Sequence, residues 1–174
     1  MLFRSHTNEI GSMPELLDEL HTSYGRTTLI SMVTTDAGNS SLKVAGLILR
    51  HGWDYFLQIK SGHGELYAEA KRALGTKTAE QAEETTVDQQ NGKVVTYRLW
   101  QHDLTDQGWL DWRHARQLVR VERIAEDSTT GEREVGNRFY VSNKAPSELS
   151  PKGGLKISRR SEEHTSELQS LSHI

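Results

Sequence analysis

Leu-Ile-Ser-Met-Val-Thr-Thr-Asp-Ala-Gly-Asn, at residues 29–39, is a short apolar run that ends on an acidic residue and a turn. A run of this kind is typical of a buried strand in a parallel sheet. Asp36 directly follows the run, at the place where open α/β sheets bind their ligands. We therefore expect a strand at residues 29–35 with a candidate functional carboxylate at its carboxyl end.

Helical patterns flank this strand, and the strand and helix signals alternate through residue 75. Ser12 and Pro14 predict a helix start before the strand, and Ser40 or Ser41 predicts another after it. Residues 53–60 alternate as a second strand, and residues 65–74 follow as a helix that ends at Gly75. This alternation favours a parallel or mostly parallel sheet with flanking helices.

The pattern changes after Gly75. Residues 76–84 form a polar linker, and the Asn91-Gly92 dipeptide predicts a hairpin between residues 85–90 and 93–100. Further strands are expected at 118–124 and 138–142, around a turn at 127–131. Residues 85–143 therefore predict an antiparallel, β-rich segment after the α/β unit. Ser150-Pro151 predicts the start of another helix.

Composition restricts the class of protein. The 174 residues are 34% hydrophobic and 26% charged, which suits one domain with a real core. The formal net charge of −3 gives no global positive field for nucleic acid, so any basic surface must be local. The chain has no cysteine, which excludes disulfides and thiolate zinc sites. We expect no membrane partner and a cytoplasmic location, because no apolar run is long enough to span a bilayer.

The C-terminal residues have a different origin. Residues 160–170 read Arg-Ser-Glu-Glu-His-Thr-Ser-Glu-Leu-Gln-Ser, which resembles the conceptual translation of a common sequencing-library adapter. We interpret residues 161–174 as a non-native, disordered tail. Glu162, Glu163 and His164 are therefore not interpreted as a metal site.

Taken in order, several segments resemble the DDE transposases of bacterial insertion sequences, in their H-repeat-associated branch. The resemblance covers about residues 7–160 and is carried by the ordered series of motifs rather than by one of them. The motifs are Asn8-Glu9-Ile10, Pro14-Glu15-Leu16-Leu17, Val33-Thr34-Thr35-Asp36-Ala37-Gly38, Gly52 to Lys60, Arg120-Val121-Glu122-Arg123 and Asn137 to Asn143.

This resemblance implies a fold and an activity. The fold is α/β, with a partial RNase H-like core at residues 1–75, a linker at 76–84, a β-rich insertion at 85–143 and the start of the final core helix at 144–160. The activity is Mg²⁺-dependent DNA cleavage and strand transfer, in which three carboxylates hold two Mg²⁺ ions that clamp the attacking and leaving oxygens. Asp36 matches the second carboxylate, as catalytic residue and metal ligand.

The other two carboxylates have no counterpart in this chain. The first belongs to a strand before the Asn-Glu-Ile motif, and the third belongs to a helix that residues 157–160 lead into. We therefore expect a gene fragment truncated at both ends. A lone carboxylate does not hold two Mg²⁺ ions usefully, so we expect Mg²⁺ to bind in the intact family and this chain alone to be inactive.

DNA is the expected partner, with self-association left open. Lys60 matches a segment that can contact a DNA phosphate, although a solvated lysine at a strand end is the plain alternative. Arg113, Arg116, Arg120 and Arg123 form a basic cluster in the β-rich segment that can hold the element end. The alternative for these arginines is cross-strand pairing with Glu122 and Glu126.

Two other functions compete with transposition. In the first, the chain is a DNA-binding remnant without chemistry, whose binding would weaken steeply with salt. In the second, it is a different α/β enzyme, a phosphatase or hydrolase that uses Asp36 as nucleophile. Asp36-Ala37-Gly38-Asn39 lacks the second aspartate that this role requires nearby.

Overall fold

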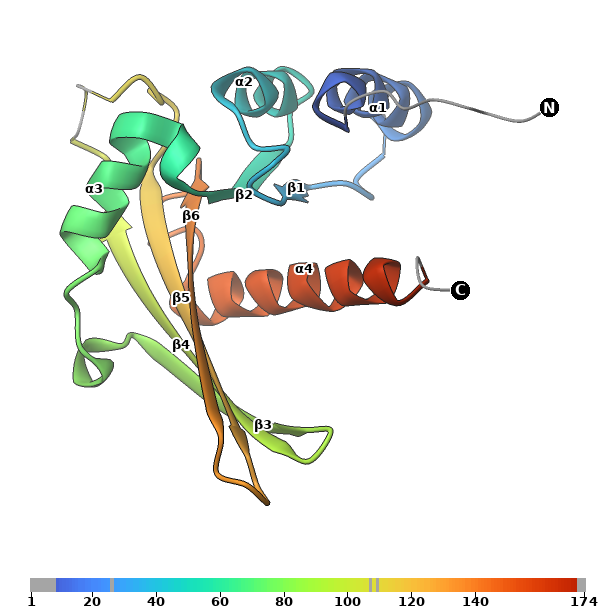
Figure 1. Cartoon of the computed structure of the whole chain (residues 1–174). Coiled ribbons are helices and arrows are strands. Elements are labelled where there is room, and N and C mark those ends of the chain that lie inside the picture. The colour runs from blue at the N-terminus through green and yellow to red at the C-terminus, as the bar shows by residue number, and fades with distance from the viewer. Residues whose placement is uncertain (1–8, 26, 107, 109, 172–174) are drawn as a thin grey trace.

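The computed structural model describes residues 9–25, 27–106, 108 and 110–171, with side chains from residue 13 to residue 161 (Figure 1). The helices and strands alternate through the first half, and four long strands and a last helix follow. In chain order the elements are α1 (Glu9–Tyr24), β1 (Met32–Thr35), α2 (Leu42–Arg50), β2 (Asp54–Ile59), η1 (Ser61–His63), α3 (Gly64–Leu74), η2 (Ala79–Gln81), β3 (Glu84–Gln90), β4 (Lys93–Asp103), β5 (Gln117–Asp127), β6 (Arg133–Ser142) and α4 (Pro151–Leu171).

The described strands form one mixed six-stranded sheet in the order β1-β2-β6-β5-β4-β3. β1 and β2 are parallel, with Val33 opposite Tyr55, and the other neighbouring strands are antiparallel. The expected parallel unit and antiparallel segment are both present. They are joined into a single sheet, because β6 pairs with β2 and places Val141 opposite Leu57.

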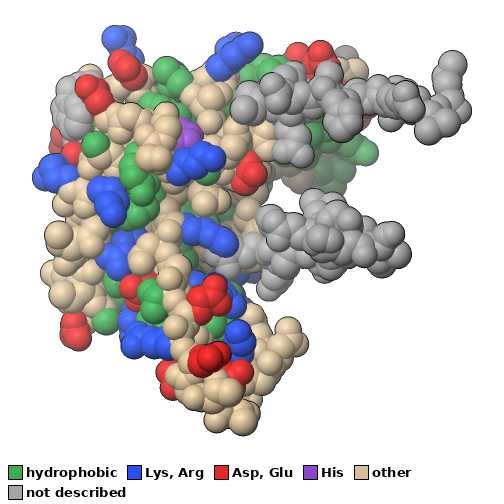
Figure 2. All heavy atoms as spheres, viewed as in Figure 1, with side chains coloured by type: hydrophobic (Ala, Val, Ile, Leu, Met, Phe, Trp, Pro, Cys, Tyr) green, Lys and Arg blue, Asp and Glu red, His purple; other side chains and the backbone are tan. Residues whose placement is uncertain are grey.

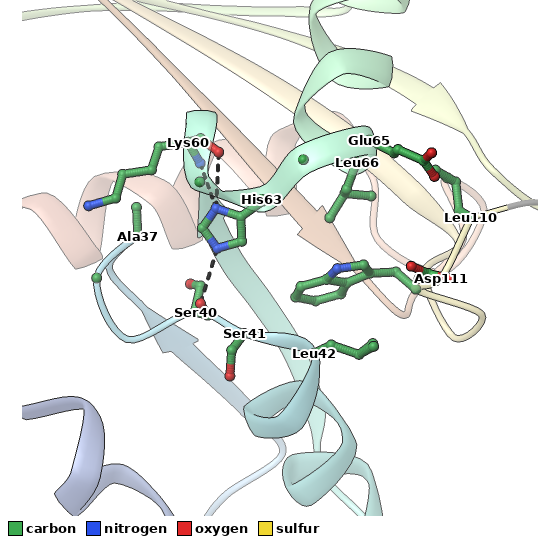
Figure 3. Close-up of a pocket in the computed structure, with 14 residues that line it drawn as sticks. Ala37, Ser40, Ser41, Leu42, Lys60, His63, Glu65, Leu66, Leu110 and Asp111 are labelled. Atoms are coloured by element: carbon green, nitrogen blue, oxygen red, sulfur yellow. Dashed lines mark hydrogen bonds between the residues drawn. The ribbon is translucent and has the colours of Figure 1, made fainter.

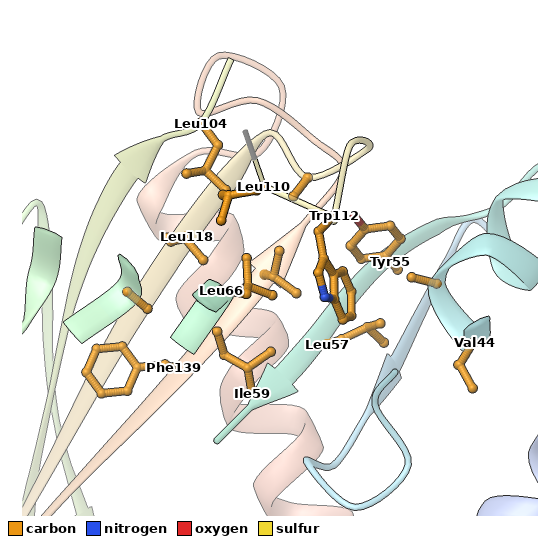
Figure 4. Packing of buried hydrophobic residues seen from close by; sticks show 14 of the residues in the cluster. Val44, Tyr55, Leu57, Ile59, Leu66, Leu104, Leu110, Trp112, Leu118 and Phe139 are labelled. Atoms are coloured by element: carbon orange, nitrogen blue, oxygen red, sulfur yellow. The ribbon is translucent and has the colours of Figure 1, made fainter. Parts of the chain in front are cut away.

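Helices cover both faces of the sheet. Figure 1 shows α1 and α2 on one side and α4 crossing the other side. The core under α1, α2 and α3 includes Leu57 and Leu118, and Figure 4 shows Leu57 beside Leu66 and Trp112. The core under α4 includes Phe56 and Leu99. Because successive residues of a strand point to opposite faces, Phe56 and Leu57 belong to different cores.

Local sequence signals explain several element ends. Ser41 caps α2, since its side chain accepts a hydrogen bond from the amide of Val44. Asn91 and Gly92 adopt φ angles of 49° and 77° between β3 and β4, which confirms the predicted tight hairpin. The helix expected at Ser150-Pro151 begins at Pro151. A Cβ on Gly154 would lie 3.3 Å from Leu99, so glycine lets α4 pack closely on the sheet.

Other boundaries differ from the expectations. The first helix begins at Glu9 with Pro14 inside it, and the strand of residues 29–35 is shorter, at Met32–Thr35. The last strand is longer, since β6 begins at Arg133. The linker at 76–84 contains the short 3₁₀ helix η2. These shifts affect element ends, where sequence signals are weakest. The expectation of a disordered tail from residue 161 differs more, because α4 continues as a helix to Leu171.

The surface carries both signs of charge. Figure 2 shows Lys and Arg side chains interspersed with Asp and Glu on the face in view, which agrees with the small net charge. In the part of the chain that the structure describes, no helix has the length and apolar character needed to cross a membrane.

Candidate functional site

The candidate site lies at the carboxyl ends of β1 and β2. Because these strands are parallel, both end at the same edge of the sheet, as expected for the ligand edge of an α/β fold. β1 continues through Asp36 and a turn into α2, and β2 continues through Lys60 and η1 into α3. Two strand-to-helix loops therefore meet at this edge.

Asp36 is exposed in the first of these loops. Its Oδ1 accepts hydrogen bonds from the backbone N–H and the side-chain amide of Asn39, both at 3.0 Å. Oδ2 has no hydrogen-bond donor among the described residues. The backbone carbonyl of Asp36 accepts from the Ser40 amide at 3.1 Å and from its hydroxyl at 2.8 Å. The turn therefore holds one carboxylate oxygen and leaves the other open to solvent or a ligand.

His63 connects the two loops (Figure 3). Its Nδ1 lies 3.0 Å from both the backbone N–H and the carbonyl oxygen of Lys60. With the ring proton on Nε2, Nδ1 accepts from the Lys60 N–H. Nε2 then donates to the carbonyl of Ser40, also at 3.0 Å. The side chain of His63 thus joins the end of β2 to the start of α2, and its two ring nitrogens are both occupied.

A pocket of about 700 Å³ opens beside these loops. Figure 3 shows Lys60 beside Ala37 at one end of the pocket, and Glu65 and Asp111 at the other. Trp112 forms part of the wall and is only 8% exposed. Ala37 and Gly38, the two residues after Asp36, line the pocket, but Asp36 itself does not.

Glu65 and Asp111 were not predicted as site residues. Glu65 is in the first turn of α3, and Asp111 belongs to the loop between β4 and β5. Nothing in the local sequence around Asp111 indicates that this loop folds back to the carboxyl ends of β1 and β2, which lie far earlier in the chain. Trp112, in the same loop, packs edge-on against Tyr55 with ring centres 6.3 Å apart, which fixes the loop in place.

Tyr55 lies beneath this edge and is fully buried. Burial raises the pKa of its hydroxyl strongly, because the charged phenolate would be desolvated. The side chain is therefore a neutral part of the core and not a proton-transfer group at neutral pH.

The four arginines predicted to form one basic cluster do not gather at one place. Arg113 and Arg116 are exposed in the loop before β5. Arg120 and Arg123 are both on β5, but residues three apart on a strand point to opposite faces of the sheet. The prediction of a single cluster was wrong because it treated the segment as a continuous surface rather than as a strand between two helical layers.

Arg120 has a structural environment. It is 8% exposed, and its guanidinium stacks on the Trp100 ring. It donates to the backbone carbonyls of Leu74 at 2.9 Å and Lys77 at 3.1 Å, just after α3. This environment favours the stabilisation of the α3 C-terminus over contact with DNA.

Arg123 has a weak ion-pair partner. Its guanidinium lies 4.0 Å from the carboxylate of Glu134, on the neighbouring strand β6. Cross-strand pairing with Glu122 and Glu126 was the alternative interpretation of these arginines. Glu122 and Glu126 lie on β5 itself, so Arg120 pairs with Glu122 along one strand. The cross-strand partner of Arg123 is Glu134 on β6.

Metal binding requires more ligands than this edge provides. Among the described residues, no group of three or more His, Asp or Glu side chains is placed to hold a metal ion. Asp36 supplies one carboxylate, whose oxygens are the kind of ligand that Mg²⁺ prefers. The described residues by themselves do not make a two-metal site.

Comparison with known proteins adds one relative and no family. No family model matches the chain. An uncharacterized protein in the dhlA 3′ region of Xanthobacter autotrophicus is 30% identical over 126 residues, which cover 69% of this chain and 40% of the relative. The chain thus spans about two fifths of the length of this curated relative, whose name states no activity.

Proposed function

We propose that this chain is part of the catalytic domain of a DDE transposase, with an RNase H-like core and Asp36 as the second metal-binding carboxylate. The observation that carries the proposal is the position of Asp36. It directly follows β1 at the carboxyl edge of two parallel strands, and its Oδ1 is held by Asn39. A carboxylate that only capped a turn would fit the same hydrogen bonds, but the order of the motifs around it favours the family role.

The placement of α4 supports the same proposal. In the resemblance, the third carboxylate belongs to a helix reached through residues 157–160, and these residues lie in α4. Met32 packs at the margin of the core under α4, so β1 alternates between that face and the face under α2. On this alternation Thr34 shares the face of Met32, and Asp36 begins the turn that follows the strand.

The expected chemistry is phosphoryl transfer on DNA. Two Mg²⁺ ions held by three carboxylates would stabilise the attacking and leaving oxygens. In this chain Asp36 would hold metal, and Lys60 at the same edge would contact a phosphate. The residues present do not complete the metal site, so we propose that this chain by itself does not cut DNA.

The test uses the protein encoded by the full reading frame around this sequence. We expect it to excise a marked element in cells, and Asp36→Asn to reduce excision to background. Asp106→Asn is the matched control, because it removes an exposed carboxylate that does not line the pocket. Undiminished excision by Asp36→Asn would overturn the assignment of Asp36.

A second measurement tests the chain as it stands. Purified protein is incubated with Mg²⁺ and supercoiled plasmid DNA that carries the flanking genomic sequence. We expect no nicking. Nicking that disappears in Asp36→Asn would show that the chain completes a working site, against the proposal.

A further inference from the structure

A second groove lies between α4 and β3, away from the Asp36 edge. It has a volume of about 380 Å³. Four of its lining side chains are basic: Lys152, Lys156, Arg159 and Arg160. Glu84 is the single acidic residue in the lining that the structure describes. A groove with this excess of positive charge stands out in a protein whose net charge is −3.

Three of these cations are arranged in a row along α4. Lys152, Lys156 and Arg160 follow one another at intervals of four residues and are exposed. Residues four apart are neighbours on one face of a helix, separated by a rise of about 6 Å. The three charges therefore form a line beside the groove rather than a compact cluster.

Arg159 serves a different purpose in the groove. Its guanidinium pairs with the Asp88 carboxylate and lies 5.0 Å from the centre of the Tyr97 ring. Both contacts tie α4 to the strands beneath it, so the charge of Arg159 is already partnered. In the part of the chain that the structure describes, Lys152, Lys156 and Arg160 have no acidic partner within ion-pair distance.

We propose that this row binds the phosphodiester backbone of DNA. A line of unpaired cations beside a groove suits a linear polyanion whose charges repeat at short intervals. The groove offers no exposed apolar side chain, since Leu155, its aliphatic member, is 3% exposed. A protein partner or a membrane surface would need apolar contact area as well. The hydroxyl of Thr86 in the lining adds a further phosphate donor.

This inference deepens the proposed function, and it rests on that function for the identity of the polyanion. It moves DNA contact from the four arginines of the β-rich segment to α4. Phosphate contacts of this kind position a duplex without reading its sequence, so the surface would bind DNA irrespective of sequence.

The experiment measures binding of the full chain to a fluorescent duplex over a range of salt concentrations, with EDTA present. The test variant is Lys152→Gln/Lys156→Gln/Arg160→Gln. The control variant is Lys43→Gln/Lys93→Gln/Arg133→Gln, which removes the same charge from exposed positions elsewhere. Urea unfolding of both variants verifies that each is folded.

We expect the test variant to lose affinity at least about tenfold at low salt, and the control to bind like the unmodified chain. The slope of log affinity against log salt should become shallower by about 0.9 for each lost contact, hence by about 2.7 in total. Equal losses in the two variants, or no DNA binding by the unmodified chain, would overturn the proposal. A third result would also overturn it: the unmodified chain binds anionic phospholipid vesicles more tightly than DNA, and the test variant loses this vesicle binding.

The two proposals fail in different ways. Binding in EDTA needs no metal and no completed active site, so it tests the α4 surface alone. Excision by the protein of the full reading frame tests Asp36. If the chain binds DNA through α4 but Asp36→Asn excises normally, the α4 surface is supported and the catalytic assignment of Asp36 fails.

Discussion

The guanidinium of Arg120 lies 4.3 Å from the centre of the Trp100 ring, on the face of the sheet that α3 covers. The stacking is continued by hydrogen bonds to backbone carbonyls at the end of α3, including that of Leu74. A cation near a helix C-terminus also complements the helix dipole. One buried side chain therefore links the β-rich segment to a helix of the α/β unit.

We predict that Arg120→Ala destabilises the fold by about 3 kcal/mol, because it leaves buried carbonyls and a carboxylate partner without their cation. Urea unfolding at neutral pH measures the loss. Arg123→Ala is the control on the same strand. Its partner Glu134 is 74% exposed, so a change of less than about 1 kcal/mol is expected. Equal effects of the two substitutions would contradict the structural role of Arg120.

The sequence predicted the element types well where a local signal was strong. The Asn91-Gly92 hairpin, the Ser41 cap and the helix start at Pro151 each depend on chemistry within a few residues. The parallel pairing of β1 with β2 followed from the alternation of strands and helices. What local patterns did not reveal is that β6 pairs with β2 across about 80 residues of chain.

The candidate site was predicted in part for the same reason. Asp36 and Lys60 each follow a strand, and parallel strands bring such residues to one edge. Asp111 reaches that edge through a long loop, which no local pattern predicts. Whether the cations of α4 are paired depends on which acidic residues the fold places opposite them. Arg120 was misplaced because a charge on a strand does not reveal which layer it faces.

A second prediction concerns the seam between β2 and β6. Asn143 accepts a hydrogen bond from the Tyr55 amide at 2.7 Å and donates to the Asp54 carboxylate at the same distance. We expect Asn143→Ala to lower the free energy of unfolding by about 1–3 kcal/mol, because the Tyr55 amide loses its acceptor. Thermal unfolding followed by far-ultraviolet and by tryptophan signals measures this.

Lys144→Gln is the control for that seam. The Lys144 ammonium lies 3.0 Å from the same Asp54 carboxylate, and both side chains are partly exposed, at 32% and 28%. Its loss should therefore cost less than about 1 kcal/mol. Since the seam lies inside one sheet, both optical signals should report a single transition. Two separate transitions would mean that the α/β unit and the β-rich segment unfold independently.

A third prediction is a loss of stability in mild acid through His102. Burial lowers the pKa of His102 below its ordinary 6.5, while the Glu69 carboxylate 3.6 Å away opposes this shift. Arg72 and Lys77 lower the pKa further, and Asp103 raises it. The unfolded chain therefore takes up the proton more readily than the folded one.

The sign follows from this difference. The contribution of His102 is fully present above about pH 6.5 and is lost as the pH falls toward the folded pKa. Urea midpoints measured from pH 7.5 to pH 5 should fall for the unmodified chain, and less steeply for His102→Gln. The difference between the two curves isolates His102 from the other histidines. Parallel curves would refute the assignment.

The last prediction concerns His63, which joins the two loops of the candidate site through the Lys60 amide and the Ser40 carbonyl. His63→Ala removes both contacts, and we expect faster hydrogen exchange at the Lys60 amide together with a loss of about 1–2 kcal/mol. His63→Asn keeps an acceptor near the position of Nδ1, and His63→Gln keeps a donor near that of Nε2. Only His63→Asn should preserve protection of the Lys60 amide, because that amide needs an acceptor. Protection restored equally by both would mean that packing of the side chain, and not its hydrogen bonds, holds the two loops together.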